Sequence, residues 1–138
     1  MTVGKTTQYK IEFAVASVHS WYYKQDKKVQ VLFNCILEFF EEFGRSTNFD
    51  KIPRSKLKKV RGAIWEIRIE YNTNIYRVFY SWDGNKCFLL HGFQKKSDAI
   101  PKQDLETALK RLKSCKHENV RHKPKKTQSK KRSKSITS

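Results

Sequence analysis

Two hydrophobic periods alternate along the chain, and together they predict an α+β fold. Between residues 27 and 43, apolar positions recur every three or four residues, as on one buried face of a helix. This face consists of Val29, Leu32, Phe33, Ile36, Phe40 and Phe43. Gly44 follows directly, in the position where glycine commonly ends a helix. We therefore predict a core helix over residues 27–43.

The middle of the chain has the two-residue period of strands. Residues 63–70 and 75–82 alternate apolar and polar side chains, and residues 86–93 are more uniformly apolar. The dipeptide Asp83-Gly84 favours a tight hairpin between the last two segments. The polar residues 71–74 join the first two. These features predict a three-stranded antiparallel meander.

Weaker signals complete the architecture. Residues 9–15 favour a short strand, and residues 17–23 favour a short helix. Pro101 suits a first helical turn, and a helix is expected from there to about Ser114. The segment 47–59 is expected to be a loop. The predicted fold is an N-terminal strand and a helical hairpin packed on an antiparallel β-meander with a C-terminal helix.

The net charge of +17 over 138 residues changes the picture, because it favours a polyanionic partner. Residues 117–138 carry eight Lys or Arg and one Glu, which leaves an excess of ten positive charges on residues 1–116. The segment 117–138 lacks the apolar residues that would offset its ordering entropy. We predict one domain over residues 1–116 and a disordered basic tail over residues 117–138.

The sequence gives no reason to expect a membrane protein or a secreted one. It contains no apolar run of about 18 residues, and its first ten residues lack an apolar signal core. Three widely spaced cysteines suit reduced thiols in the cytoplasm. Cys115, His117 and His122 could in principle ligate zinc, but no second paired element accompanies them.

An arginine pair is the most informative candidate site. If residues 71–74 form the loop, Glu70 pairs with Ile75, and Arg68 then lies directly across from Arg77. Like charges in such positions destabilise a sheet, and a phosphate would offset the cost because guanidinium donors match its oxygens. The alternative is that both arginines are solvated and balanced by Glu66 and Glu70.

Two further groups of basic residues are candidates. His91, Lys95 and Lys96 lie within six residues of one another at the exit of the last strand, where binding groups are common. The alternatives are a solvated lysine pair and a structural histidine, which in one hairpin register points toward Tyr76 on the core face. A basic tract would contact phosphates as an RNA-binding patch, or be merely solvated; it contains Lys56, Lys58, Lys59 and Arg61.

Several catalytic motifs are missing from the chain. It has no glycine-rich phosphate loop, no HExxH or CxxC, and no convincing carboxylate cluster for magnesium. Phosphodiester chemistry without a metal is possible on RNA, because its own 2′-hydroxyl can attack the neighbouring phosphorus. The protein would then only align the groups, take a proton and stabilise the charged phosphorane. We expect no cofactor.

The blocks "WEIRI", "YRVFY", "LLHGFQKKS" and "PKQDLETALKR" lie between residues 57 and 114. In their order and spacing they resemble the phage-derived HigB-like branch of the RelE/ParE toxin superfamily. The resemblance implies a RelE-like fold and a type II toxin that cleaves mRNA on the ribosome. It also implies a cognate helix-turn-helix antitoxin as partner.

The resemblance carries roles to individual residues. Arg77 would stabilise the phosphate in the transition state, and Arg68 would orient a phosphate or a base. Lys95 or Lys96 would stabilise charge or donate a proton, and His91 is the nearest candidate for proton transfer. Two other functions stay open: a non-catalytic basic protein that binds RNA or ribosomes, and gyrase inhibition as in the ParE branch.

Overall fold

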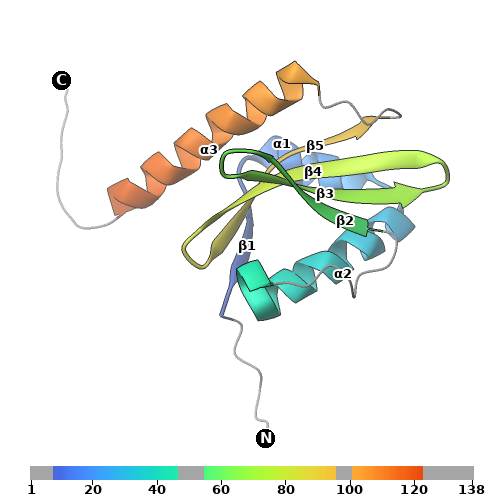
Figure 1. Cartoon of the computed structure of the whole chain (residues 1–138), viewed down its shortest axis with the longest axis horizontal. Helices are drawn as coiled ribbons and strands as arrows, with labels where there is room; N and C mark the ends of the chain where they lie inside the picture. Colours follow the sequence, from blue (N-terminus) through green and yellow to red (C-terminus); the bar gives the residue numbers. More distant parts are fainter. Residues whose placement is uncertain (1–7, 47–54, 96–100, 123–138) are drawn as a thin grey trace, which may run out of the picture.

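The computed structural model describes residues 8–46, 55–95 and 101–122, with the backbone alone for residues 55, 56, 95 and 117–122. Its centre is a five-stranded sheet in the order β1-β5-β4-β3-β2 (Figure 1). β1 runs parallel to β5, and every other neighbouring pair is antiparallel. The strands are β1 (Lys10–Phe13), β2 (Ser55–Arg61), β3 (Ile64–Tyr71), β4 (Asn74–Asp83) and β5 (Lys86–Lys95).

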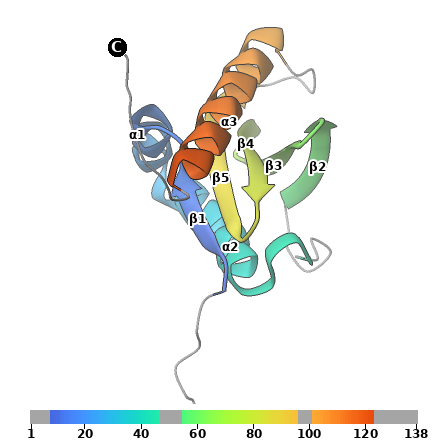
Figure 2. The same cartoon turned by 90° about the vertical axis from the view of Figure 1, so that its left-hand side faces the viewer.

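Helices lie on both faces of this sheet. α1 (Ala16–Lys24), α2 (Lys27–Phe43) and the short 3-10 helix η1 (Gly44–Ser46) cover one face. α3 (Lys102–His122) covers the other, above β5 and the neighbouring part of β4, as Figure 2 shows. β2 and β3 extend beyond α3 on that side. The α+β class predicted from the sequence is confirmed.

Each face of the sheet has its own hydrophobic core. The larger core joins α1 and α2 to alternate residues of β3, β4 and β5, including Ile67, Val78 and Leu89. The smaller core joins α3 to the opposite set; its buried members are Ile64, Phe79, Phe88, Leu90, Phe93, Ala108, Leu112 and Cys115. A sheet that is apolar on both faces explains why residues 86–93 lack strict alternation.

α2 confirms the predicted bounds at both ends. The Asp26 carboxylate accepts a hydrogen bond from the backbone N–H of Lys28 at 2.8 Å, as an N-cap does. Gly44 ends the helix with a φ of +61°, which favours glycine. A Cβ at Gly44 would also lie 2.5 Å from the ring of Tyr9. Position 44 therefore requires glycine for two independent reasons.

The sequence prediction was wrong about the segment before β3. Residues 55–61 form the edge strand β2 rather than the end of a loop, so the meander has four strands. Leu57, which stands between two lysines, packs partly buried against the larger core, and Val60 packs against the smaller one. Lysines are common on edge strands because they discourage pairing with other chains.

The two ends of the fold also differ from the prediction. β1 is shorter than the predicted strand 9–15. α3 continues to His122 instead of ending near Ser114, and so takes in the first six residues assigned to the tail. No glycine or proline interrupts it before Pro124. No helix in the described part of the chain is long and apolar enough to cross a membrane.

The predicted pairing of β3 with β4 is confirmed. Asn72 and Thr73 form a tight turn, both with positive φ values (51° and 64°), as two-residue hairpins require. Glu70 consequently pairs with Ile75, and Arg68 pairs with Arg77. The hairpin between β4 and β5 turns at Gly84, which has a φ of +62°.

Candidate functional site

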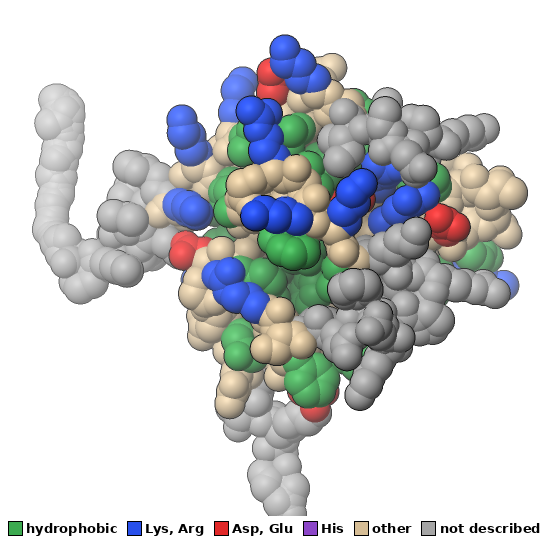
Figure 3. Space-filling view, viewed as in Figure 1, with side chains coloured by type: hydrophobic (Ala, Val, Ile, Leu, Met, Phe, Trp, Pro, Cys, Tyr) green, Lys and Arg blue, Asp and Glu red, His purple; other side chains and the backbone are tan. Residues whose placement is uncertain are grey.

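The α3 side of the sheet carries four of the nine predicted site residues, Arg68, Arg77, His91 and Lys58, in two cross-strand rows. One row runs Lys56, Arg68, Arg77, Phe93 across β2 to β5, and the next runs Lys58, Glu66, Phe79, His91. We call the side formed by these two rows the cationic face. Figure 3 shows lysine and arginine side chains gathered along α3 and across the neighbouring strands, with few acidic ones among them.

Arg77 lies at the centre of the cationic face and is buried. Its side chain is 2% exposed, and its Nη1 donates to Glu66 Oε2 at 3.1 Å. The Glu66 side chain is 1% exposed. Burying either charge alone would be costly, so each requires the other. The pair neutralises the guanidinium and fixes it between β3 and β4.

Arg68 is the more accessible arginine of the face. Its Nη2 lies 3.1 Å from Oε2 of Glu70, and the two side chains are 17% and 58% exposed. Glu70 is two residues further along the same strand, so the pair does not link separate elements. Water and salt screen this contact more than they screen the buried pair of Arg77 and Glu66.

His91 joins β5 to α3 through both of its ring nitrogens. Nε2 lies 2.5 Å from Oδ1 of Asp104, and Nδ1 lies 3.3 Å from Nη1 of Arg111. Arg111 also donates to the backbone oxygen of Leu90 at 2.9 Å and to Ser17 Oγ at 3.3 Å. Arg111 thereby connects α3 to both β5 and α1.

These partners fix the tautomer of the histidine. A guanidinium only donates hydrogen bonds, so His91 Nδ1 must accept from Arg111. Nε2 then carries the proton and donates it to the Asp104 carboxylate. Proton exchange between His91 and a substrate would require Asp104 or Arg111 to release one ring nitrogen.

A β-bulge places His91 on this face. Tyr80 pairs with Leu89 but Phe79 pairs with His91, so Leu90 is the extra residue. The sequence register that pointed His91 toward Tyr76 on the core face was therefore wrong. A one-residue bulge sends every following side chain to the opposite face. His91 consequently stacks on Phe93, with ring centroids 5.5 Å apart.

The remaining predicted residues are distributed more widely. Lys58 is exposed and pairs with Glu66 in the second row. Lys59 is exposed too, but pairs with Trp65 and so belongs to the opposite side of the sheet. Arg61 lies exposed at the end of β2, beyond a second bulge. The backbone of Lys95 pairs with Ile75, and Lys96 lies outside the described residues.

Asp104 and Arg111 were missed by reasoning from the sequence. They lie seven residues apart, two turns of one helix, and therefore on the same side of α3. That spacing was visible in the sequence, but nothing indicated that His91 would lie opposite.

In the described part of the chain, no three His, Cys, Asp or Glu side chains are close enough together to hold a metal ion. Burial raises the pKa of the Cys87 thiol, which keeps that cysteine protonated.

The fold and the cationic face define a class: a small basic α+β protein with arginine, lysine and histidine residues on one sheet face. The model of the phage-derived Gp49-like protein family matches residues 20–113, about two thirds of the chain. The chain therefore belongs to this family, which is related to the RelE-like toxins. No curated protein matched the chain.

Proposed function

We propose that the protein is the toxin of a type II toxin–antitoxin pair, of the HigB-like branch, and that it cleaves mRNA on the ribosome. One observation carries the proposal: the partly exposed Arg68 and the exposed Lys58 lie on the same sheet face, beside a buried arginine that is paired across the strands. Membership of a family related to RelE-like toxins supports it.

The reaction needs only groups that RNA and this face supply. The 2′-oxygen attacks the adjacent phosphorus and loses its proton, and the bond to the 5′-oxygen breaks as that oxygen gains a proton. The products are a 2′,3′-cyclic phosphate and a 5′-hydroxyl. Arg68 and Lys58 would bind the non-bridging oxygens and stabilise the added negative charge of the phosphorane.

The burial of Arg77 changes the role that we propose for it. Its guanidinium is committed to Glu66, so we assign it to positioning the neighbouring Arg68 rather than to contact with the phosphate. His91 remains the candidate for proton transfer, provided that substrate displaces Asp104 or Arg111 from the ring.

Induced expression in a bacterium, with mapping of transcript 5′-ends, tests the enzyme. Growth should stop and new 5′-hydroxyl ends should appear within coding regions. Arg68→Ala should abolish both effects. Lys24→Ala is the matched control, because Lys24 is exposed on α1 at the opposite face. Continued growth without new ends would refute the enzyme.

A second candidate function is a protein that binds RNA or ribosomes without cutting them. The observation that favours it is the engagement of both His91 ring nitrogens. Such a protein would sediment with ribosomes in a salt-dependent way and would leave transcript ends unchanged. Both candidate functions thus predict binding to ribosomes, but only the enzyme predicts new transcript 5′-ends.

The partner expected of a type II toxin is an antitoxin, which we propose to be a small helix-turn-helix protein encoded beside it. Its acidic or apolar segments would cover the cationic face and block RNA. Co-expression of the neighbouring gene should restore growth. The two proteins should then co-purify, and Arg68 should become less accessible to arginine-modifying reagents.

A further inference from the structure

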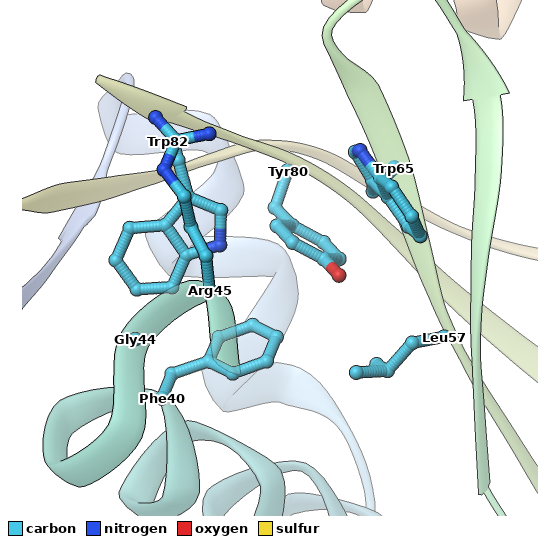
Figure 4. Close-up of a pocket in the computed structure, with 7 residues that line it drawn as sticks. All are labelled: Phe40, Gly44, Arg45, Leu57, Trp65, Tyr80 and Trp82. Atoms are coloured by element: carbon cyan, nitrogen blue, oxygen red, sulfur yellow. The ribbon is translucent and has the colours of Figure 1, made fainter. Parts of the chain in front are cut away.

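An aromatic cavity of about 380 Å³ lies on the opposite side of the sheet from the cationic face, between β2, β3, β4 and the end of α2. Figure 4 shows Trp65 and Leu57 on one side of it, Phe40, Trp82 and Arg45 on the other, and Tyr80 between them. The register explains the cluster, because Trp65 and Tyr80 are directly paired across β3 and β4.

Packing alone does not account for two of these side chains. Trp65 is 38% exposed, an unusual state for a tryptophan beside a hydrophobic core. Tyr80 is 3% exposed, and its hydroxyl points into the cavity in Figure 4. Within residues 8–46, 55–95 and 101–122 this hydroxyl makes no hydrogen bond, so a molecule in the cavity could bond to it. The cavity therefore offers both an aromatic surface and an unused polar group.

Two exposed basic residues, Arg45 and Lys59, lie on the cavity side of the sheet. Arg45 lines it from η1 and is exposed. Lys59 pairs with Trp65 across β2 and β3, so it lies on the same side of the sheet, and it is also exposed. None of the described residues that line the cavity is acidic. A ligand that fits must combine a flat ring, a hydrogen-bonding edge and a nearby negative charge.

We propose that this cavity binds one unstacked base of single-stranded RNA. The base would stack on Trp65, its edge would hydrogen-bond to the Tyr80 hydroxyl, and Arg45 and Lys59 would contact the flanking phosphates. Proteins commonly recognise single-stranded RNA by stacking splayed bases on aromatic side chains. The volume suits a single nucleotide, since small-molecule pockets begin at about 300 Å³. The inference rests on the proposed function in that RNA is the ligand, but it does not require cleavage.

The three tryptophans make the test specific. The full-length ¹⁵N-labelled protein would be titrated with adenosine and uridine 5′-monophosphates, and then with a six-nucleotide RNA. The indole N–H signals of Trp65 and Trp82 should shift and saturate. That of Trp21, which packs against Phe33 and Gly92 away from the cavity, should not. An unchanged Trp65 signal, or equal shifts of all three signals, would overturn the proposal.

Two substitutions sharpen the result. Trp65→Ala removes the stacking surface and should weaken binding of the mononucleotides by about tenfold or more. Tyr80→Phe keeps the ring and removes only the hydroxyl, and should weaken binding about three- to tenfold. Lys24→Ala is the matched control, because Lys24 is exposed on α1 and does not line the cavity, and it should not change mononucleotide binding. Circular dichroism would confirm that each variant is folded.

The outcomes separate this inference from the proposed function. If Tyr80→Phe and Trp65→Ala bind nucleotides like the parent protein while toxicity persists, the base-binding site is refuted and the enzyme stands. If nucleotides shift Trp65 as expected but no transcript is cut, the site stands and the enzyme fails. If Trp65 responds to the antitoxin and to no nucleotide, the cavity is a protein-binding site and the proposal is wrong.

Discussion

Two arginine–glutamate pairs lie side by side on the cationic face, and both have 3.1 Å between nitrogen and oxygen. In the pair of Arg77 and Glu66 the side chains are 2% and 1% exposed, whereas in the pair of Arg68 and Glu70 they are 17% and 58% exposed. The first pair bridges β3 and β4, and the second stays within β3. The two ion pairs therefore have the same nitrogen–oxygen distance but differ in burial and in the strands that they join.

This difference in exposure suggests that one arginine stabilises the fold and that the other is in a position to bind a ligand. A buried pair contributes little net stability, but either partner left alone is strongly destabilising. A pair that water reaches contributes less, and about 0–1 kcal/mol when both side chains are exposed. Arg77 thus acts as a fixed part of the fold, and Arg68 is the arginine that we propose for phosphate binding. The two arginines should respond in opposite ways to substitution.

The largest effect should follow Arg77→Ala. This variant leaves Glu66 buried and uncompensated, which should lower the free energy of unfolding by about 3–5 kcal/mol. Urea denaturation followed by circular dichroism measures it. The double variant Glu66→Leu with Arg77→Met should recover most of the loss, because an apolar pair can replace a buried ion pair. If Arg77→Ala keeps full stability and loses toxicity, Arg77 belongs to the chemistry.

Arg68→Ala should have the opposite pattern, with a large loss of activity and a small loss of stability. Loss of one group that stabilises the charged transition state typically costs about 10²- to 10³-fold in rate, whereas stability should change by less than about 1 kcal/mol. Cleavage of a reporter mRNA in a translating extract gives the rate. Glu70→Gln is the control, since it removes the charge of the Glu70 side chain and keeps the Arg68 guanidinium, and it should not lower the rate. A large loss of stability in Arg68→Ala would contradict the comparison.

Asp104→Ala tests the contact that joins α3 to β5. Losing the charged acceptor of His91 Nε2 should lower the free energy of unfolding by about 1–2 kcal/mol. Thermal or urea unfolding measures this loss. Reporter cleavage at a temperature where the variant is folded measures the activity. A fall in activity far beyond the fall in stability would place His91 and Asp104 in proton transfer.

The smallest effect should come from Lys58→Ala. Lys58 is exposed, so stability should change by less than about 0.5 kcal/mol. If it contacts one phosphate of single-stranded RNA, the slope of log affinity against log salt should become shallower by about 0.7. Filter binding across a salt series measures the slope. Lys24→Ala should leave the slope unchanged, and an equal change there would mean that only net charge matters.

Much of the fold could be predicted from the sequence because the residues that determine it are close together in the chain. The helix over residues 27–43 has an apolar face, a capping residue and a terminal glycine, all within one segment. The pairing of Arg68 with Arg77 followed from a single turn, because two residues with positive φ set the register of the whole hairpin. β2 was not predicted because only Leu57 and Val60 are apolar in a segment of mostly basic residues.

The candidate site was predicted in part. The sequence placed Arg68 opposite Arg77, but it could not show that one is buried and the other accessible. Gly92 is a similar case: a Cβ there would lie 2.3 Å from Trp21, a constraint set by α1 lying over β5. The aromatic cavity gave no sequence signal, because its lining residues come from α2, η1 and three strands.

The sequence by itself determined the α+β class, the basic surface, the core helix and the register of the first hairpin, since neighbouring residues encode each of these. The tertiary structure alone decided which arginine is buried, which face His91 occupies, and that Asp104 and Arg111 engage it. A single extra residue in β5 turns His91 toward α3, and the packing of that helix brings its partners within hydrogen-bond distance. Such contacts join residues far apart in the chain, and only the folded arrangement specifies them.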